Sequence, residues 1–288
     1  MSEKHILLAT LGNQPQVVTF TLDRLLPMYP INDVIVLHPA TEQTKLQRSL
    51  DTLTREFSGD YYAAAQRTIH FHPQVLQHNN KPLAEIDNDR AADGVLDTLH
   101  KLIGDLKRQD YTIHLSITGG RRLMGLLATS VAMLNFDRHD HIWHIYTPDH
   151  IQEQAHEGAL MHAPMEAGIR LIQAPFLSLG AYVYYSPPTF RRAQDEFRSQ
   201  MDAQERAHCA QVVQASTQAQ YKVLQAFSEG LRPQQVADRL AITVRTVHSH
   251  TSALLGHCYN AWTIDGQERL DYHFLESKFA RYFSEAQP

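Results

Sequence analysis

Residues 114–129 constrain the fold more than any other stretch of this sequence; they read His-Leu-Ser-Ile-Thr-Gly-Gly-Arg-Arg-Leu-Met-Gly-Leu-Leu-Ala-Thr. The stretch begins as a short apolar strand that stops at Thr118, Gly119 and Gly120. Apolar side chains then recur at helical spacing, at Leu123, Leu126, Leu127, Val131 and Leu134. The sequence therefore predicts a strand followed at once by a helix that packs on a sheet through these apolar residues.

The turn between this strand and helix has the features of an anion site. Gly119 and Gly120 allow a sharp turn and a close approach to a ligand, and the helix start offers free N–H groups and a positive dipole end. Arg121 and Arg122 add guanidinium groups, each of which can bind two phosphate oxygens in a planar, bidentate contact. The turn matches neither a Walker A loop nor a Gly-x-Gly-x-x-Gly loop. We therefore expect a phosphate cradle, although a plain turn with two solvated arginines has the same sequence.

Strands and helices alternate through the first half of the chain. Strands are predicted at 5–10, 33–38, 68–73, 111–118 and 142–147, and helices from Pro15, at 41–57, at 86–109 and after Gly120. This order predicts an α/β domain with a parallel, Rossmann-like, doubly wound sheet. Ligands of such sheets bind beyond the carboxyl ends of the strands, where the winding reverses. If the first and fourth strands are neighbours, residues 10–14 and 118–122 share that crevice.

Composition limits the class of protein. A chain of 288 residues with 43% hydrophobic content can bury a core and suggests two domains. The absence of a long apolar run excludes a membrane span, and an N-terminus that leads straight into a strand predicts no signal peptide. Two cysteines, Cys209 and Cys258, are too few for a disulfide framework, so the expected location is cytoplasmic. A net charge of −5 argues against coating nucleic acid by charge alone, but allows a small basic reading head.

The second half changes character. Prolines punctuate residues 148–188, where 176–185 is compatible with a strand or hairpin, and a polar helix from Thr189 to about Ala215 predicts a linker or a dimer-forming helix. Helices are then expected at 218–227, 234–240, 244–255 and 267–283, with Gly230 ending the first, Pro233 starting the second and a turn at 241–243. The predicted domains are 1–188, 189–215 and 216–288, the last an all-α helix-turn-helix domain.

The C-terminal segment resembles the LuxR/GerE-type helix-turn-helix. The resemblance covers residues 221–255 and rests on Val223-Leu224, Glu229-Gly230-Leu231, Val236-Ala237, Arg239-Leu240, Ile242, Arg245-Thr246-Val247 and His250. It implies binding to double-stranded DNA as a dimer, although the same motif also serves protein packing. By this similarity Arg245 and Thr246 lie near phosphates, His248 and Ser249 lie near base edges in the major groove, and His250 also faces DNA. The family often has Lys and Asn where this chain has His248 and Ser249.

The N-terminal domain resembles the CRISPR-associated Rossmann fold (CARF) family. Residues 7–12, 15–18 and 116–124 carry the resemblance, most of all the Thr-Gly-Gly-Arg block. It implies a homodimer that binds cyclic oligoadenylate, with cyclic tetra-adenylate the first candidate, across its two-fold axis and without a cofactor. The residues implied to contact the ligand are Thr10, Gly12, Asn13 and Gln14 from one side and Thr118, Gly119, Gly120, Arg121 and Arg122 from the other. The two resemblances together suggest a ligand-sensing DNA-binding regulator associated with type III CRISPR defence.

Three alternatives involve other chemistry. Some CARF domains cleave their ligand without metal, so a ring nuclease is the alternative function; the candidate catalytic residues are Thr10, Asn13, Gln14, Ser116, Arg121 and Arg122. The Arg-x-x-x-x-His spacing of HEPN ribonucleases occurs at 245–250 and, by chance inside a predicted strand, at 67–72; the helix-turn-helix explains more of the C-terminal residues. Eighteen histidines invite a metal site, with His139, His141 and His144 close together and His70 and His72 on one side of a strand. No cysteine or carboxylate cluster completes a ligand set, so no metal is predicted.

Overall fold

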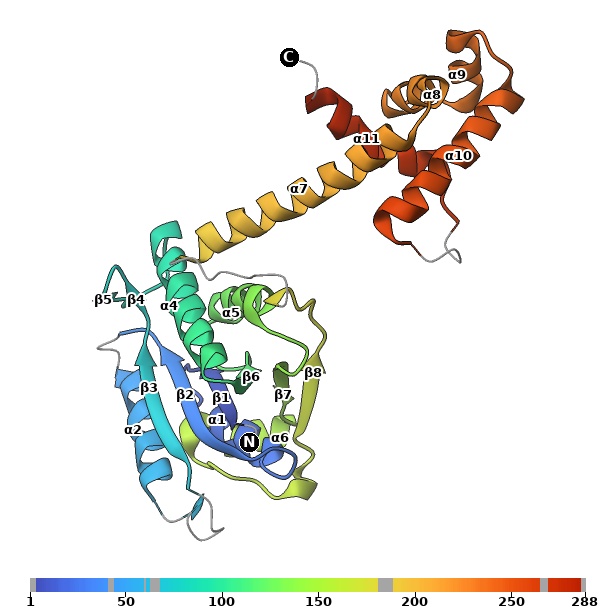
Figure 1. Cartoon of the computed structure of the whole chain (residues 1–288). Helices are drawn as coiled ribbons and strands as arrows, with labels where there is room; N and C mark the ends of the chain where they lie inside the picture. The colour runs from blue at the N-terminus through green and yellow to red at the C-terminus, as the bar shows by residue number, and fades with distance from the viewer. Residues whose placement is uncertain are drawn as a thin grey trace. The chain divides into compact units, whose positions relative to one another are not determined.

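The computed structural model describes residues 4–40, 44–59, 61–62, 68–180, 189–264 and 269–285. The chain divides into two compact units, residues 1–197 and 198–288 (Figure 1). The boundary falls within a helix that the sequence assigns to a linker, and the linker role itself stays a prediction. No described helix combines the length and the apolar character that a membrane crossing requires.

The first unit is built on a six-stranded sheet with the order β3-β2-β1-β6-β7-β8. The strands are β1 (Lys4–Thr10), β2 (Ile31–His38), β3 (His70–Val75), β6 (Tyr111–Ser116), β7 (His141–Tyr146) and β8 (Arg170–Ala174). The first five are parallel, as predicted, whereas β8 runs antiparallel to β7. A small hairpin of β4 (Gln77–His78) and β5 (Lys81–Pro82) stands apart from this sheet. The predicted parallel α/β domain is confirmed, with an unforeseen antiparallel edge strand.

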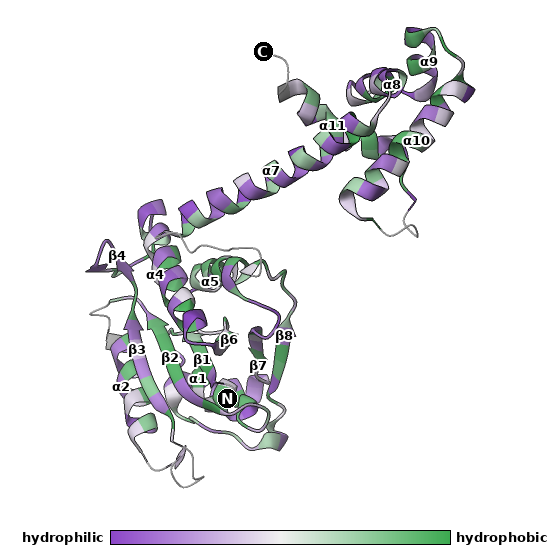
Figure 2. Ribbon diagram, viewed as in Figure 1, coloured by the Kyte–Doolittle hydropathy of each residue, from purple (hydrophilic) through white to green (hydrophobic). Residues whose placement is uncertain are grey.

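Helices cover both faces of the sheet (Figure 1). They are α1 (Gln16–Leu25), α2 (Thr44–Ser58), α4 (Asp89–Arg108), α5 (Arg122–Asn135) and the short α6 (Asp149–Gln154), followed by the single turns η1 (His156–Gly158) and η2 (Met165–Ala167). One apolar cluster joins α4 and α5 to the sheet, and a second joins α1 and α2 to its other face. Figure 2 shows the matching hydrophobic character of β1 and β2. Residues 41–43, the predicted start of the second helix, lie outside the described residues.

The predicted packing face of α5 is partly wrong. Leu123 and Leu126 are 41% and 67% exposed, although the sequence pattern places them against the sheet. The buried face contains smaller residues instead: Met124, Gly125, Ala128, Val131, Ala132 and Leu134. A Cβ on Gly125 would lie 3.1 Å from the carbonyl oxygen of Ile117. The helix therefore lies close to the sheet through its small residues, and this rotates the large leucines outward.

One helix, α7 (Phe190–Ala215), contributes to the cores of both units. Phe190 and Ala193 belong to the α4/α5 cluster of the first unit, where the Asp97 carboxylate accepts a hydrogen bond from the Phe190 amide at 2.8 Å. Cys209 and Val212 belong to the core of the second unit. Residues 176–180 form no strand, and the rest of the predicted 176–185 element lies outside the described residues.

The second unit contains the predicted series of short helices. They are α8 (Gln218–Ser228), α9 (Pro233–Leu240), α10 (Val244–Trp262) and α11 (Tyr272–Glu285). Thr217 and Gln220 form a capping box before α8, and Thr243 caps α10 through the Thr246 amide. Gly230 has the positive φ of +82° predicted for a helix end, and Ala241 turns the chain between α9 and α10 with a φ of 53°. The α10 helix continues past the predicted end at 255, and α11 begins later than the predicted 267.

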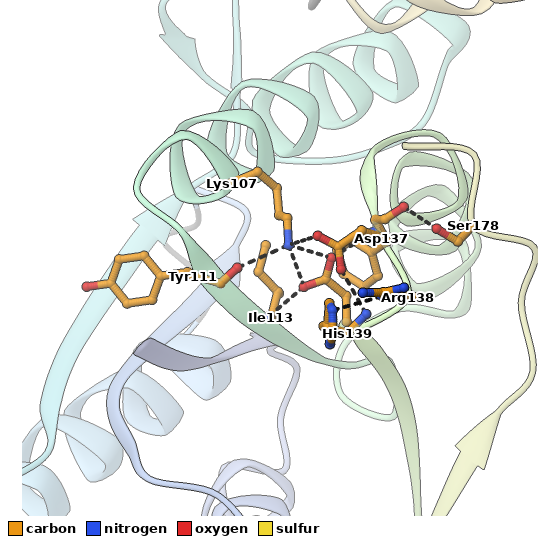
Figure 3. Close-up of polar contacts among 9 residues, drawn as sticks. Lys107, Tyr111, Ile113, Asp137, Arg138, His139 and Ser178 are labelled. Atoms are coloured by element: carbon orange, nitrogen blue, oxygen red, sulfur yellow. Dashed lines mark hydrogen bonds and ion pairs between the residues drawn. The ribbon is translucent and has the colours of Figure 1, made fainter. Parts of the chain in front are cut away.

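A buried ion pair fixes the end of α4 to the sheet. The Lys107 ammonium lies 2.7 Å from an Asp137 oxygen and 2.8 Å from an Asp140 oxygen, and it donates to the Tyr111 carbonyl at 3.1 Å (Figure 3). The Asp140 side chain has no exposed surface and also accepts hydrogen bonds from the amides of Ile113 and Asp137. The pair thereby connects α4, β6 and the turn before β7.

Replacing Lys107 with Met should lower the free energy of unfolding of the first unit by about 3–5 kcal/mol, because a buried carboxylate then lacks its counter-charge. Urea unfolding in a Trp262→Phe background measures this, since Trp143 is then the remaining tryptophan of the sequence. Lys101→Met, at an exposed position of the same helix, should change the value by less than about 0.5 kcal/mol. Equal effects of the two substitutions would contradict this account.

A second charged contact ties the loop after α6 to two helices. The His162 ring lies 2.7 Å from an Asp23 oxygen of α1 and 2.9 Å from a Glu56 oxygen of α2, and it stacks on Tyr61. Burial alone would lower the pKa of His162, but the two carboxylates outweigh burial and raise it above its ordinary 6.5. The imidazolium therefore stabilises the fold.

Because the pKa of His162 is raised on folding, its contribution is full below pH 6.5 and is lost as pH rises through the folded pKa. Urea unfolding from about pH 5 to about pH 9 should show wild type exceeding His162→Gln most at the acid end, with the difference shrinking as pH rises. His150→Gln, at an exposed position, serves as the control. A difference that does not vary with pH would refute this role.

Candidate functional site

The predicted crevice lies where the sheet reverses its winding. β1 and β6 are parallel neighbours, with Ala9 opposite Ser116, and the remaining strands extend outward from this pair on both sides. The loops that follow the two strands therefore meet at the topological switch point, the usual ligand position in such sheets. The Thr10 hydroxyl donates a hydrogen bond to the Gly119 carbonyl. The structure confirms that residues 10–14 and 118–122 lie together.

Glycines permit this close contact between the loops. A Cβ on Gly119 would lie 2.0 Å from the Thr10 carbonyl oxygen, and one on Gly12 would lie 3.0 Å from the Gly120 nitrogen and Cα. Gly120 has a φ of +80°, a conformation that side chains disfavour. The backbone itself therefore forms the floor of the crevice.

Two cations stand at the start of α5 without an acidic partner in its first turn. Arg121 is the N-cap and Arg122 the first helical residue, and both are exposed. Such cations oppose the positive end of the helix dipole, so the region attracts an anion. Glu85 supplies one, 3.5 Å from the Arg121 guanidinium, in an ion pair whose side chains are both about half exposed. Exposed pairs of this kind are weak and are readily exchanged for a stronger anion.

A hollow of about 200 Å³ opens beside Arg121. Its lining includes Gly12, Asn13, Gly120 and Arg121, which are four of the predicted contacts. Pro39 and Ala84 also line it. Backbone amides, a guanidinium and an asparagine side chain are suited to phosphate oxygens.

Five predicted contacts do not line this hollow, namely Thr10, Gln14, Thr118, Gly119 and Arg122, and neither does the catalytic candidate Ser116. Thr10 and Ser116 are each only 1% exposed. The Thr10 hydroxyl is used by Gly119, and the Ser116 hydroxyl lies 3.4 Å from that of Thr21. Both side chains are therefore buried and bonded within the fold, which argues against the predicted ligand contact of Thr10 and the catalytic candidacy of both, and these roles stay predictions.

Gln14 and Thr118 border a second, larger hollow of about 490 Å³. The Thr118 hydroxyl accepts from the Ile145 amide at 2.9 Å and pairs with the His144 ring at 3.2 Å. Gln16 and Tyr146 also line this hollow. The sequence does not indicate either residue. Gln16 lies within a helical pattern, and Tyr146 belongs to a strand whose position next to this hollow depends on the tertiary fold.

The histidine groups of the sequence are the natural candidates for a metal site. Within the described ranges no group of three His, Cys, Asp or Glu side chains is arranged to hold a metal ion. His70 and His72 face the same Asp33 oxygen at 3.4 and 3.5 Å. The Trp143 indole donates to His114, whose pKa burial lowers to about 3, so that ring stays neutral.

The predicted reading face of the second unit is only partly exposed. Arg245, His248 and Ser249 are exposed, whereas Thr246 and His250 are half-buried. Of the residues expected to hold α10 in place, Val247 and Leu254 are buried, and Ile242 and Leu255 are half-buried. The turn and the helix start therefore place a cation and small polar groups on one surface.

A family described as CRISPR-associated protein NE0113 matches residues 14–210, more than half of the chain. The chain belongs to this family. The matched region includes α5 with its two arginines and most of α7, and together with the Rossmann-like sheet it supports a CRISPR-associated CARF domain. No curated protein matches the sequence.

Several solved structures match this NE0113-family chain at low sequence identity. A type III CRISPR defence DNA nuclease activated by cyclic oligoadenylate matches at 15% identity and a TM-score of 0.31, over 50% of this chain and 19% of its own. Enterococcus italicus Csm6 bound to cyclic hexa-2′-fluoro-hexa-dAMP matches at 11% identity and a TM-score of 0.41, over 99% of this chain and 77% of its own. Can2 from Sulfobacillus thermosulfidooxidans in complex with cyclic tetra-adenylate matches at 14% identity and a TM-score of 0.30, over 98% of this chain and 68% of its own.

In this NE0113-family protein, Gly119→Ala should lower the free energy of unfolding of the first unit by about 3 kcal/mol, because the new Cβ forces the two loops apart. Gly256→Ala in α10 is the matched control, since nothing lies within 4 Å of its added Cβ. Urea unfolding followed by the two tryptophans measures both. An unchanged transition in Gly119→Ala would show that the loops are not in contact.

Proposed function

We propose that this protein is a homodimeric sensor that binds cyclic oligoadenylate and regulates DNA binding in type III CRISPR defence. The observation that carries the proposal is the crevice at the switch point. Two glycine loops meet there, and Arg121 and Arg122 stand exposed at the start of α5 without an acidic residue in its first turn. A ligand rich in phosphates satisfies both the backbone amides and the guanidinium groups.

A second copy of the chain would complete the binding surface. Leu123 and Leu126 follow the two arginines on α5 and are exposed, although large apolar side chains at adjacent turns favour a covered position. Pairing two copies through this face covers these leucines and places two crevices around one axis. A cyclic ligand with matching symmetry then contacts both copies in the same way.

The second unit supplies the proposed DNA contact. α9 and α10 are joined by a three-residue turn in which Ala241 has a positive φ, and Thr243 caps α10. Arg245 stands at the start of α10 with His248 and Ser249 on the exposed surface, which suits a phosphate contact beside base contacts. Arg239 is paired with Glu229, which reduces the positive charge that one copy offers to DNA phosphates. Two copies together therefore bind DNA more tightly than one.

The α7 helix provides the proposed coupling between ligand and DNA. Its first residues belong to the core of the first unit, and its later residues belong to the core of the second unit. A movement at one end of the helix is therefore transmitted to the core at the other end. The ligand changes DNA binding only as far as it binds one dimer geometry better than another.

The substitution of both Arg121 and Arg122 with Ala should weaken cyclic tetra-adenylate binding by about a hundredfold or more, because two charge-assisted contacts are lost. Isothermal titration calorimetry measures this. The double variant should still bind its own promoter in a gel shift, but without a response to the ligand. Arg90→Ala with Arg108→Ala is the matched control, since both residues are exposed on α4.

Ligand affinity that survives in the Arg121→Ala, Arg122→Ala variant would contradict the crevice as the binding site. Incubation of the purified wild-type protein with radiolabelled cyclic tetra-adenylate distinguishes the alternative function. An intact ring supports a sensor, whereas linear products indicate a ring nuclease and would require Asn13, Gln14, Arg121 or Arg122 to act, since Thr10 and Ser116 are buried.

A further inference from the structure

A hollow of about 480 Å³ opens in the second unit, where the start of α8, the end of α9 and the first half of α10 meet. Its lining contains one basic side chain from each of these helices, namely Lys222, Arg239 and His250. No acidic side chain is found among the described residues that line it. A concave surface of this composition attracts anions.

Lys222 is the cation of this lining that stays available to a ligand. Its side chain is exposed, and it has no hydrogen bond or ion pair with another described residue. Arg239 differs, because its guanidinium is paired with Glu229, which accepts a second hydrogen bond from Nη2 at 3.4 Å. This pair reduces the charge of Arg239 but holds its guanidinium beside the hollow. The net positive charge of the lining therefore depends mainly on Lys222.

His250 places the hollow on the flank of the α10 reading surface. On an α-helix this residue lies roughly 140° around the axis from Arg245. It is half-buried, whereas Arg245, His248 and Ser249 are exposed. Because His250 lines the hollow, the hollow lies beside the side chains that are proposed to read bases.

We propose that this hollow binds a phosphate group and that the phosphate belongs to the DNA backbone beside the reading helix. A helix in the major groove has a sugar-phosphate backbone on each side of it, so a basic hollow on its flank meets phosphates and not base edges. The choice of DNA rests on the proposed function, whereas the affinity for phosphate rests on the basic lining. The inference adds α8, which precedes the two helices of the motif, to the DNA interface.

A phosphate contact of Lys222 has a signature that base contacts lack. Each phosphate that a lysine neutralises releases counterions, so the affinity falls more steeply as salt is added. The backbone is the same in every sequence, so such a contact strengthens binding to all DNA alike. Contacts of His248 or Ser249 with base edges would instead change the preference between sequences.

Fluorescence anisotropy with the full chain tests the proposal, on a duplex that contains its own promoter and on a scrambled duplex, from about 50 to about 200 mM KCl. Lys222→Gln should weaken binding to both duplexes by the same factor, about threefold to tenfold, and should reduce the slope of log affinity against log salt by about one unit for each copy bound. Lys222→Arg should keep the wild-type values, because a guanidinium also binds phosphate. Lys81→Gln, at an exposed position of the first unit, is the matched control and should behave as wild type.

A slope that Lys222→Gln leaves unchanged, or a loss confined to the promoter duplex, would overturn the proposal without touching the proposed DNA binding. If wild type binds neither duplex, calorimetry with pyrophosphate decides between the remaining cases. Pyrophosphate binding that is lost in Lys222→Gln but kept in the Arg121→Ala, Arg122→Ala variant would establish the phosphate site and refute DNA as its source. No binding, or binding that Lys222→Gln does not change, would refute the site together with the proposed DNA contact.

Discussion

The carbonyl oxygen of Thr10 occupies the position that any side chain at residue 119 would need, and the candidate site depends on this contact. Parallel pairing of β1 with β6 brings the two loops to the same edge of the sheet. Only a backbone without a Cβ then fits between them, which leaves peptide groups and not side chains as the floor of the crevice. The start of α5 is fixed by the same contact, so the two arginines are held where the loops meet.

Hydroxyl and amide side chains around the crevice hold these loops in position. Thr10 bonds to Gly119, Thr118 accepts from the Ile145 amide, and Gln14 accepts from the Glu157 amide. Because these oxygens are used within the fold, the guanidinium groups, the Asn13 side chain and the exposed backbone amides are the groups best placed to bind an anion. Gln16 differs from them, because its Oε1 is buried and has no hydrogen-bond partner among the described residues.

The sequence predicts the sheet well because its strands are short apolar segments between clear helices, and it predicts the crevice because paired glycines and arginines at a strand end are seldom needed for packing alone. It misplaces Leu123 and Leu126 because helical spacing does not tell which of two adjacent faces packs, and small residues allow a closer approach. It does not predict β8, because that strand has no fully buried residue and only Leu171 and Ala174 pack on the apolar clusters, and because prolines lie close by in the sequence. The role of Thr10 does not follow from sequence, since the partner that its hydroxyl bonds is distant in the chain.

Hydrogen–deuterium exchange with and without cyclic tetra-adenylate tests the central claim most directly, because it reports on the backbone amides that are proposed to hold the phosphates. The account predicts slower exchange in peptides that contain residues 12–14 and 119–122, where the two loops meet. Ligand binding that leaves both segments unchanged and protects another part of the chain would contradict it.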